Sequence, residues 1–304
     1  MQIKPVGLKA TDAPAGGTAT LADFIEVPWN LYGDDPNWVP PLKFERKEAL
    51  SENAPFFAHA DWQAWVAYEN NKPVGRITAQ IDHLYEPRHG EPVGFFGFLD
   101  APDNQEMFDA LLACAKDWLR ARDRTRMVGP FNLGVNQEVG LLVEGFDTPP
   151  YFMMGHNGRY HSARIEEAGL SGVQDMLAYL MDPDYTEPRV ATMLKKRYLG
   201  GVKVRTIDKK NLDAELETMR DIFNDAWAKN WSFVPFTEEE FNAVGKELLM
   251  ITPQDFLMIA EIDERPVAFI VLLPNVNALI HDLNGKLFPF GWAKALWRLK
   301  ARPL

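Results

Sequence analysis

Residues 62–81 read WQAWVAYENNKPVGRITAQI, and residues 256–273 read FLMIAEIDERPVAFIVLL. Each stretch predicts a β-hairpin, because two runs rich in β-branched and aromatic residues flank a short polar turn. The turns, Asn70-Asn71-Lys72 and Asp263-Glu264-Arg265, each run into Pro-Val. One hairpin therefore repeats the other.

The similarity between the two halves of the chain extends beyond the hairpins. Predicted strands at Ile3–Lys9 and Val202–Asp208 each precede a helical stretch that ends in tryptophan, at Trp29 and Trp227. The offset between equivalent positions shrinks from 198 at these tryptophans to 193 at the hairpin prolines, as small loop deletions would produce. Features that recur in one order at nearly constant spacing indicate a duplicated structural unit.

The duplication predicts two modules, at residues 1–182 and 183–304. In the first module the hairpin is followed by an apolar strand at Gly94–Leu99, a helix with an apolar stripe over 108–119, and a strand at Arg126–Phe131. The counterparts of these elements in the second module would lie past residue 304. We therefore expect an α/β (α+β) fold of two mixed-sheet modules flanked by helices, with the second module truncated.

Composition narrows the class of protein. Hydrophobic residues make up 46% and charged residues 25% of the chain, as in ordinary globular proteins. The net charge of -11 argues against a nucleic-acid partner, because binding to phosphates needs a basic face. The single cysteine, Cys114, excludes an intrachain disulfide and a thiolate zinc cluster. Without a leader sequence or an apolar run of about eighteen residues, a cytoplasmic protein with no transmembrane segment is expected.

Three stretches carry a resemblance to a known superfamily: Gly129–Pro150 (GPFNLGVNQEVGLLVEGFDTPP), Asp35–Pro41 and Ala163–Leu170. Together with the order of elements, they resemble the GNAT N-acetyltransferases, and specifically the tandem members that carry two GNAT folds. The resemblance implies an acyl-CoA-dependent N-acyltransferase that moves an acetyl or longer acyl group to a small-molecule amine or a peptide. It implies acetyl-CoA or another acyl-CoA as co-substrate, and no metal. The alternative is a non-catalytic binding or scaffold protein with a degenerate tandem GNAT fold.

The first module departs from the GNAT pattern where coenzyme A would be held. GNAT enzymes bind the pyrophosphate on backbone N–H groups at the start of a helix, beside glycines. The corresponding loop, Asp100–Gln105, has two carboxylates and no glycine, and Asp103 is expected to cap the helix itself. Ile165 stands where family enzymes often carry a proton-donating tyrosine. The resemblance thus implies a non-catalytic first module, with the cofactor loop of the second beyond this chain.

Polar and aromatic residues in two regions are candidates for the acceptor site. Glu138 follows a strand end, where sites of open sheets gather, and is a candidate for the catalytic base. The substrate-binding candidates are Asn132, Asn136, His156, Asn157, Tyr160, Trp231, Phe233 and Phe236. Hydrogen bonding within the loop explains the polar candidates, and core packing the aromatic ones, as simpler alternatives. His156 and His161 are five residues apart and do not share a helical face, which disfavours a metal pair.

The end of the chain is basic and amphipathic. Residues 286–304 contain five Lys or Arg residues and no acid, and Trp292, Ala295, Leu296 and Leu299 share one helical face. Such a helix can make weak contact with an anionic membrane surface. The alternative is that this face packs against a module outside this chain.

Overall fold

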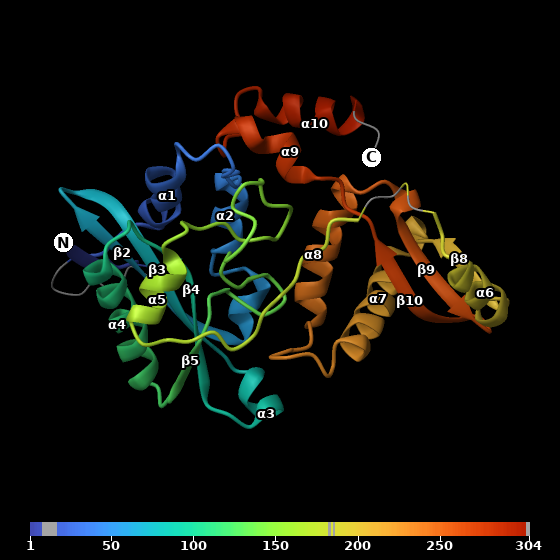
Figure 1. Ribbon diagram of the computed structural model, residues 1–304, viewed down its shortest axis with the longest axis horizontal. Coiled ribbons are helices and arrows are strands. Elements are labelled where there is room, and N and C mark those ends of the chain that lie inside the picture. The colour runs from blue at the N-terminus through green and yellow to red at the C-terminus, as the bar shows by residue number, and fades with distance from the viewer. Residues whose placement is uncertain (8–16, 182–183, 185, 302–304) are drawn as a thin grey trace. The chain divides into compact units, whose positions relative to one another are not determined.

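The computed structural model describes residues 1–7, 17–181, 184 and 186–301. They form two compact units (Figure 1). Unit 1 comprises residues 1–171, 232–234 and 275–304, and unit 2 comprises residues 172–231 and 235–274. Each unit combines a β-sheet with helices, which confirms the expected mixed α/β class.

The central sheet of unit 1 has five strands in the order β1-β2-β3-β4-β5. The strands are β1 (Gln2–Pro5), β2 (Ala60–Glu69), β3 (Lys72–Asp82), β4 (Val93–Asp100) and β5 (Arg126–Val128). All neighbours pair antiparallel except β4 and β5, which run parallel. The β2–β3 hairpin is the one predicted from residues 62–81. Its turn residues Asn70 and Asn71 have φ values of 50° and 63°, as in a type I′ turn, whose twist matches antiparallel strands.

Helices cover both faces of this sheet (Figure 1). The helices of unit 1 are α1 (Leu21–Tyr32), α2 (Lys43–Ala49), α3 (Tyr85–His89), α4 (Gln105–Arg120), α5 (His161–Glu167), α9 (Val276–Ile280) and α10 (Gly291–Ala301), with 3-10 turns η1 (Pro55–Ala58) and η4 (His281–Leu283). Phe108 of α4 packs in one core cluster with Ile77 of β3, and Phe24 of α1 packs with Val66 of β2 in another. Fully burying each such side chain is worth about 1.5–3 kcal/mol, so these two layers hold the sheet in place.

The start of α4 differs from the expectation by one residue. Asn104 caps the helix, because its side chain accepts a hydrogen bond of 3.2 Å from the backbone N–H of Met107. Asp103 instead accepts a hydrogen bond of 2.7 Å from Arg164 Nε. The expectation that Asp103 caps α4 is therefore wrong.

Unit 2 contains a three-stranded antiparallel sheet in the order β10-β9-β8. Its elements are α6 (Arg189–Tyr198), β8 (Val202–Thr206), η2 (Lys209–Asn211), α7 (Leu212–Ala226), α8 (Glu238–Ile251), η3 (Gln254–Phe256), β9 (Leu257–Ile262) and β10 (Arg265–Val271). Thr237 and Glu240 form a capping box at the start of α8. The hairpin turn again has two residues with positive φ, Asp263 at 49° and Glu264 at 63°.

The order β8, α7, α8, β9, β10 follows the order β1, α1, α2, β2, β3, with the same antiparallel pairing. The tandem GNAT arrangement itself stays a prediction. Among the described helices, none combines the length and the apolar composition that crossing a bilayer requires.

Candidate active site

An imidazole and a carboxylate meet in unit 1 where the loop after α1 passes the segment before α5. His156 Nε2 lies 3.0 Å from Asp35 Oδ2, and only 5% of the His156 side chain is exposed. His156 Nδ1 is buried and has no hydrogen-bond partner among the described residues. A carboxylate at one ring nitrogen favours the tautomer that carries its proton there. Nδ1 then carries a lone pair and no proton.

Local hydrogen bonds hold the two loops of this pair in place. Asp35 Oδ1 accepts a hydrogen bond of 2.9 Å from the backbone N–H of Asn37, which leaves Oδ2 for His156. Asn37 Nδ2 donates to the carbonyl of Phe146 at 3.0 Å. Asn157 is bonded to both backbone groups of Leu142, at 2.7 Å and 3.1 Å. Asn157, a predicted substrate contact, therefore braces the loop that presents His156.

Tyr32, at the end of α1, connects the Asp35–His156 pair to further buried polar groups. Its ring stands edge-on to the ring of His156, with centroids 5.5 Å apart. Its hydroxyl donates to Asp100 Oδ1 at 2.6 Å and lies 3.4 Å from His161 Nε2. Arg76 Nε donates to Asp100 Oδ2 at 2.7 Å. Both oxygens of Asp100 are thus satisfied at the end of β4.

Burial sets the protonation of these groups. It raises the pKa of Tyr32 well above its ordinary value, and the charge of Asp100 raises it further, so the hydroxyl stays a proton donor. Burial lowers the pKa of His161, although Asp100 acts in the opposite direction, and favours the neutral ring. Burial also raises the pKa of Tyr160 to about 12. The Tyr160 hydroxyl donates to the carbonyl of Ala101 at 2.7 Å, so this predicted substrate contact is engaged within the fold.

Glu138 and Asn132 belong to a different polar group. Arg46 donates to Glu138 Oε1, and Asn132 Nδ2 donates to Glu138 Oε2 at 3.0 Å. Burial acts to raise the pKa of Glu138, but Arg46 and Asn132 outweigh it and lower this pKa from its ordinary value. A carboxylate with a lowered pKa is a weaker base. These contacts work against the predicted role of Glu138 as catalytic base, which stays a prediction.

Asn132 also accepts a hydrogen bond from a backbone N–H that a bulge in β4 leaves without a partner strand. The pairing of β3 with β4 shifts register between Arg76 and Thr78, and Phe98 in β4 has a φ of 46°. A bulge leaves an N–H outside the ladder, where it can hold an anionic oxygen. In unit 1 the N–H of Phe98 donates to Asn132 Oδ1 at 2.7 Å. This donor and the N–H of Met107 at the start of α4 are therefore both engaged.

The remaining predicted contacts do not gather in one site. Asn136 Nδ2 donates to the carbonyl of Val234 at 2.8 Å. Phe233 is buried in unit 1, with the guanidinium of Arg88 5.5 Å from its ring centre. Trp231 and Phe236 belong to unit 2, where Phe236 packs against the rings of Phe223 and Phe241. The three aromatic candidates, Trp231, Phe233 and Phe236, are thus divided between the two units.

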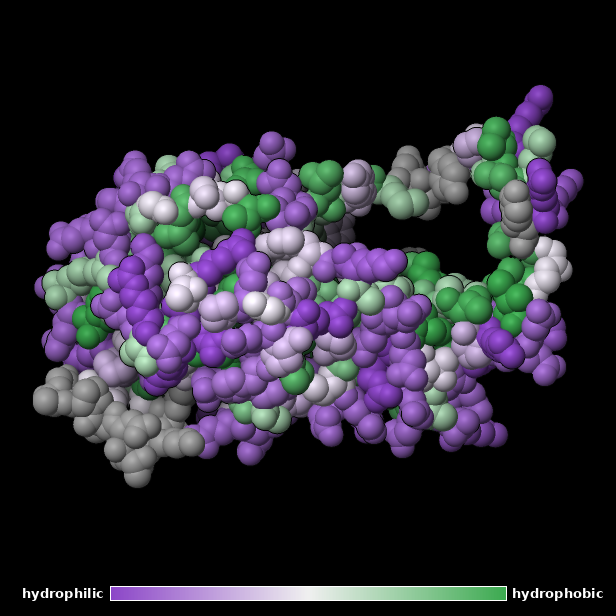
Figure 2. Space-filling model, turned by 90° about the horizontal axis from the view of Figure 1, so that it is seen from below, coloured by the Kyte–Doolittle hydropathy of each residue, from purple (hydrophilic) through white to green (hydrophobic). Residues whose placement is uncertain are grey.

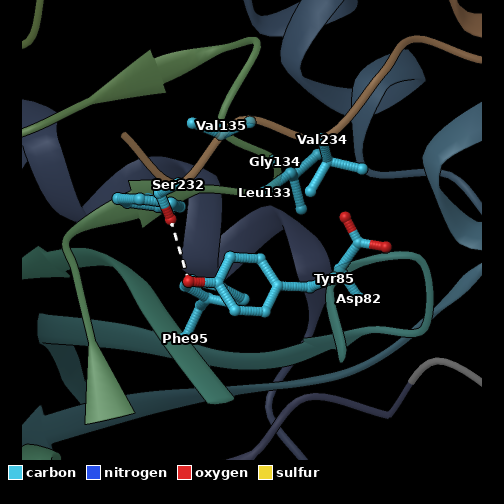
Figure 3. A pocket seen from close by; sticks show the side chains of 9 residues that line it. Asp82, Tyr85, Phe95, Leu133, Gly134, Val135, Ser232 and Val234 are labelled. Carbon is cyan, nitrogen blue, oxygen red and sulfur yellow. Dashed lines mark hydrogen bonds between the residues drawn. The ribbon is translucent and has the colours of Figure 1, made fainter. Parts of the chain in front are cut away.

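A small pocket in unit 1 is mainly apolar (Figure 3). Its lining consists of Asp82, Tyr85, Phe95, Phe131, Leu133, Gly134, Val135, Ser232 and Val234. Ser232 Oγ lies 3.4 Å from the Tyr85 hydroxyl, the contact drawn in Figure 3. Asp82 Oδ1 is bonded to His59 Nδ1 at 3.0 Å and to the backbone N–H of Leu84 at 2.9 Å. The pocket offers apolar contact, and its carboxylate is already used within the fold.

The sequence pointed to His156 as a candidate. It did not reveal that Asp35 and Tyr32 contact His156, or that Asp100 bonds Tyr32. Asp35 begins the stretch Asp35–Pro41, which carries part of the family resemblance. That resemblance is the sequence feature that could have identified Asp35 as a site residue. Tyr32 and Asp100 meet across 68 residues of sequence, so no local motif links them. Among the described residues, no group of three or more His, Cys, Asp or Glu side chains is arranged to hold a metal ion.

Two known proteins are similar to this chain over most of its length, and no family model matches it. Protein YghO of Escherichia coli strain K12 is 49% identical over 281 residues, which cover 92% of this chain and 72% of that protein. The bacterial ceramide synthase of Caulobacter vibrioides is 47% identical over 292 residues, which cover 95% of this chain and 76% of that protein.

Proposed function

Because this chain belongs to the family of Escherichia coli protein YghO and the Caulobacter vibrioides bacterial ceramide synthase, we propose that it is an acyltransferase that forms an amide bond. The observation that carries the proposal is the 47% identity to the ceramide synthase across 95% of the chain. A ceramide is the amide of a fatty acid and a long-chain amino alcohol. Its synthesis therefore moves a fatty acyl group to an amine nitrogen, and the relationship supports an acyltransferase-type function.

The donor in this proposal is an acyl-CoA, and the acceptor is a primary amine on a long-chain amino alcohol. The resemblance to GNAT N-acetyltransferases supports a coenzyme A thioester. The name of the C. vibrioides relative supports a fatty acyl group and a lipid amine in place of an acetyl group and a peptide.

The reaction requires a group that accepts a proton. The ammonium form of the acceptor loses one proton, and its nitrogen then attacks the thioester carbonyl carbon. As the C–S bond breaks, the nitrogen loses a second proton and the departing thiolate is protonated. We assign the first proton to His156 Nδ1, because Asp35 holds the ring through Nε2 and leaves the lone pair on Nδ1.

A second candidate is a binding or scaffold role, at least for unit 1. The engaged N–H of Phe98 and the capping of α4 by Asn104 favour it, because both occupy donors that a thioester or a phosphate would use. Unit 1 would then support acyl transfer without holding the donor.

The test is an assay of the full-length protein with a long-chain acyl-CoA and a long-chain amino alcohol. Release of free thiol is followed with a chromogenic disulfide, and the amide is identified by mass spectrometry. We expect His156→Gln to lower kcat by at least about 100-fold with little change in KM. His83→Gln is the matched control, because His83 also pairs with a carboxylate, Asp61 at 3.1 Å, but is more than half exposed.

Two results would count against the proposal. If the full-length protein releases no thiol and forms no amide, the scaffold role is favoured. If the amide forms and His156→Gln keeps the parent kcat, the acyltransferase stands and the assignment of His156 is wrong.

A further inference from the structure

Large apolar side chains gather at the surface of unit 1 within residues 288–297. On the face seen in Figure 2, by contrast, hydrophilic residues predominate and hydrophobic ones form separate spots. The α10 patch, as we name it, consists of five exposed residues: Phe288, Phe290, Trp292, Leu296 and Trp297. Phe288 is 83% and Trp297 68% exposed, so most of their apolar surface meets solvent. Large apolar side chains that are exposed so close together in the chain are typical of an interaction site.

The opposite side of α10 explains why this patch faces outward. Ala295 and Leu299 pack against the buried cluster of Val39, Leu279, Ile280 and Leu283. Arg298 donates to both carboxylate oxygens of Asp282, at 2.6 Å and 2.9 Å, and Lys294 pairs with the same carboxylate. The face predicted from Trp292, Ala295, Leu296 and Leu299 is therefore divided, with Ala295 and Leu299 inside and the other two outside.

The charge around the α10 patch is opposite to that of the whole chain. No Asp or Glu occurs after Asp282, although the net charge of the chain is -11. Asp282 is matched by Lys294 and Arg298, while Lys286 and Lys300 are exposed. Aromatic side chains beside lysines are typical of helices that lie at the surface of an anionic bilayer.

Two elements just before the patch, α9 and η4, contact the loops of the candidate active site. His281 Nε2 lies 3.3 Å from the carbonyl of Pro36, next to Asp35. Asn277 Nδ2 donates to the carbonyl of Pro150 at 2.7 Å. Residues 151–154, a run of four exposed large apolar side chains, follow Pro150 and lead to Gly155 and His156.

We propose that the α10 patch, with Lys286 and Lys300 beside it, docks on an anionic lipid bilayer. A bilayer fits this surface better than a protein partner, because lysine is depleted from protein–protein interfaces and attracted to anionic lipid. Docking would bring the loops of Asp35 and His156 near the lipid surface. The proposal concerns binding and does not depend on the acyltransferase activity.

The experiment measures binding of the full-length protein to vesicles by co-sedimentation and by tryptophan fluorescence. One set of vesicles contains phosphatidylcholine with phosphatidylglycerol, and the other contains phosphatidylcholine alone. We expect binding to the anionic set, with a blue shift of the fluorescence. The double variant Trp292→Ser/Trp297→Ser is expected to bind at least about tenfold more weakly. Lys286→Glu/Lys300→Glu is expected to lose the preference for anionic vesicles.

Tyr179→Ser/Leu180→Ser is the matched control, because these side chains are also large and exposed, at 81% and 90%, but lie in unit 2. Circular dichroism verifies that each variant is folded. The proposal is overturned if the parent and the tryptophan variant bind anionic vesicles equally, or if the folded parent binds neither set. A dimer of the parent that the tryptophan variant cannot form, without vesicle binding, would assign the patch to a second copy of the chain.

Discussion

The hydroxyl of Tyr32 donates a hydrogen bond of 2.6 Å to Asp100 Oδ1, from the end of α1 to the end of β4. Tyr32→Phe removes this donor from a buried carboxylate, so we expect the free energy of unfolding to fall by about 1–3 kcal/mol. Urea titration measures the change. Tyr68→Phe is the control, because its hydroxyl donates to Asp23 at 2.9 Å in a less buried place. Equal losses in both variants would contradict the prediction.

The stability of unit 1 should depend on pH through His161. Burial lowers the pKa of this ring, so the folded protein binds the proton less readily than the unfolded chain, whose histidines titrate near about 6.5. The stabilisation by the neutral ring is therefore complete above that pH and is lost as pH falls below it. We expect the Tm to drop between about pH 7 and pH 5, and to drop less in His161→Gln. An identical pH dependence in that variant would disprove the role of His161.

Arg46 holds Glu138 in its charged form and also contacts Glu45 at 3.3 Å. Arg46→Ala leaves these carboxylates without their cation, and we expect a loss of about 1–3 kcal/mol of unfolding free energy, since the pair is only partly exposed. Arg120→Ala is the control. Its pair with Asp117, at 3.8 Å, is largely exposed, and its loss should cost less than about 1 kcal/mol. The prediction fails if denaturant titration gives the same value for both.

Glu264 occupies the left-handed region of backbone conformation in the β9–β10 turn, with a φ of 63°. A side chain costs about 1–2 kcal/mol there, and glycine avoids this cost. Glu264→Gly is therefore expected to raise the unfolding free energy by up to about 1 kcal/mol. Asn71→Gly, at the equivalent turn of the β2–β3 hairpin, should gain less, because asparagine tolerates this conformation. A lower Tm for Glu264→Gly would argue against the prediction.

The parts of the fold that could be predicted from the sequence are those fixed by local interactions. Runs of β-branched and aromatic residues around a polar turn identified both hairpins. The capping box at Thr237 is local in the same way, because it joins atoms three residues apart. The cap of α4 was missed because Asp103 and Asn104 are both good capping residues. Asp103 is bonded to Arg164, which is distant in sequence, and Asn104 therefore caps the helix.

The candidate site was harder to predict because its partners are far apart in the chain. Asp35 and His156 are separated by 121 residues, and no spacing rule links them. Glu138 was chosen as a base for its place after a strand, but Arg46, 92 residues away, decides its pKa. The spacing of apolar residues identified one apolar face of α10. Contact with the cluster of Leu279 and Leu283 then determines that Ala295 and Leu299 are the residues of this face that pack inward.

Unit 1 is discontinuous, and this has a consequence for its synthesis. Its first 171 residues leave the ribosome without Val234, which completes the cluster around Tyr85 and Phe95. They also lack the 275–301 segment that buries Val39. At roughly 5–20 residues per second, the nascent domain waits on the order of ten seconds for these pieces. During that interval the apolar side chains of Val39 and the Tyr85 cluster lack their covering residues, and a chaperone that binds exposed apolar surface can bind them.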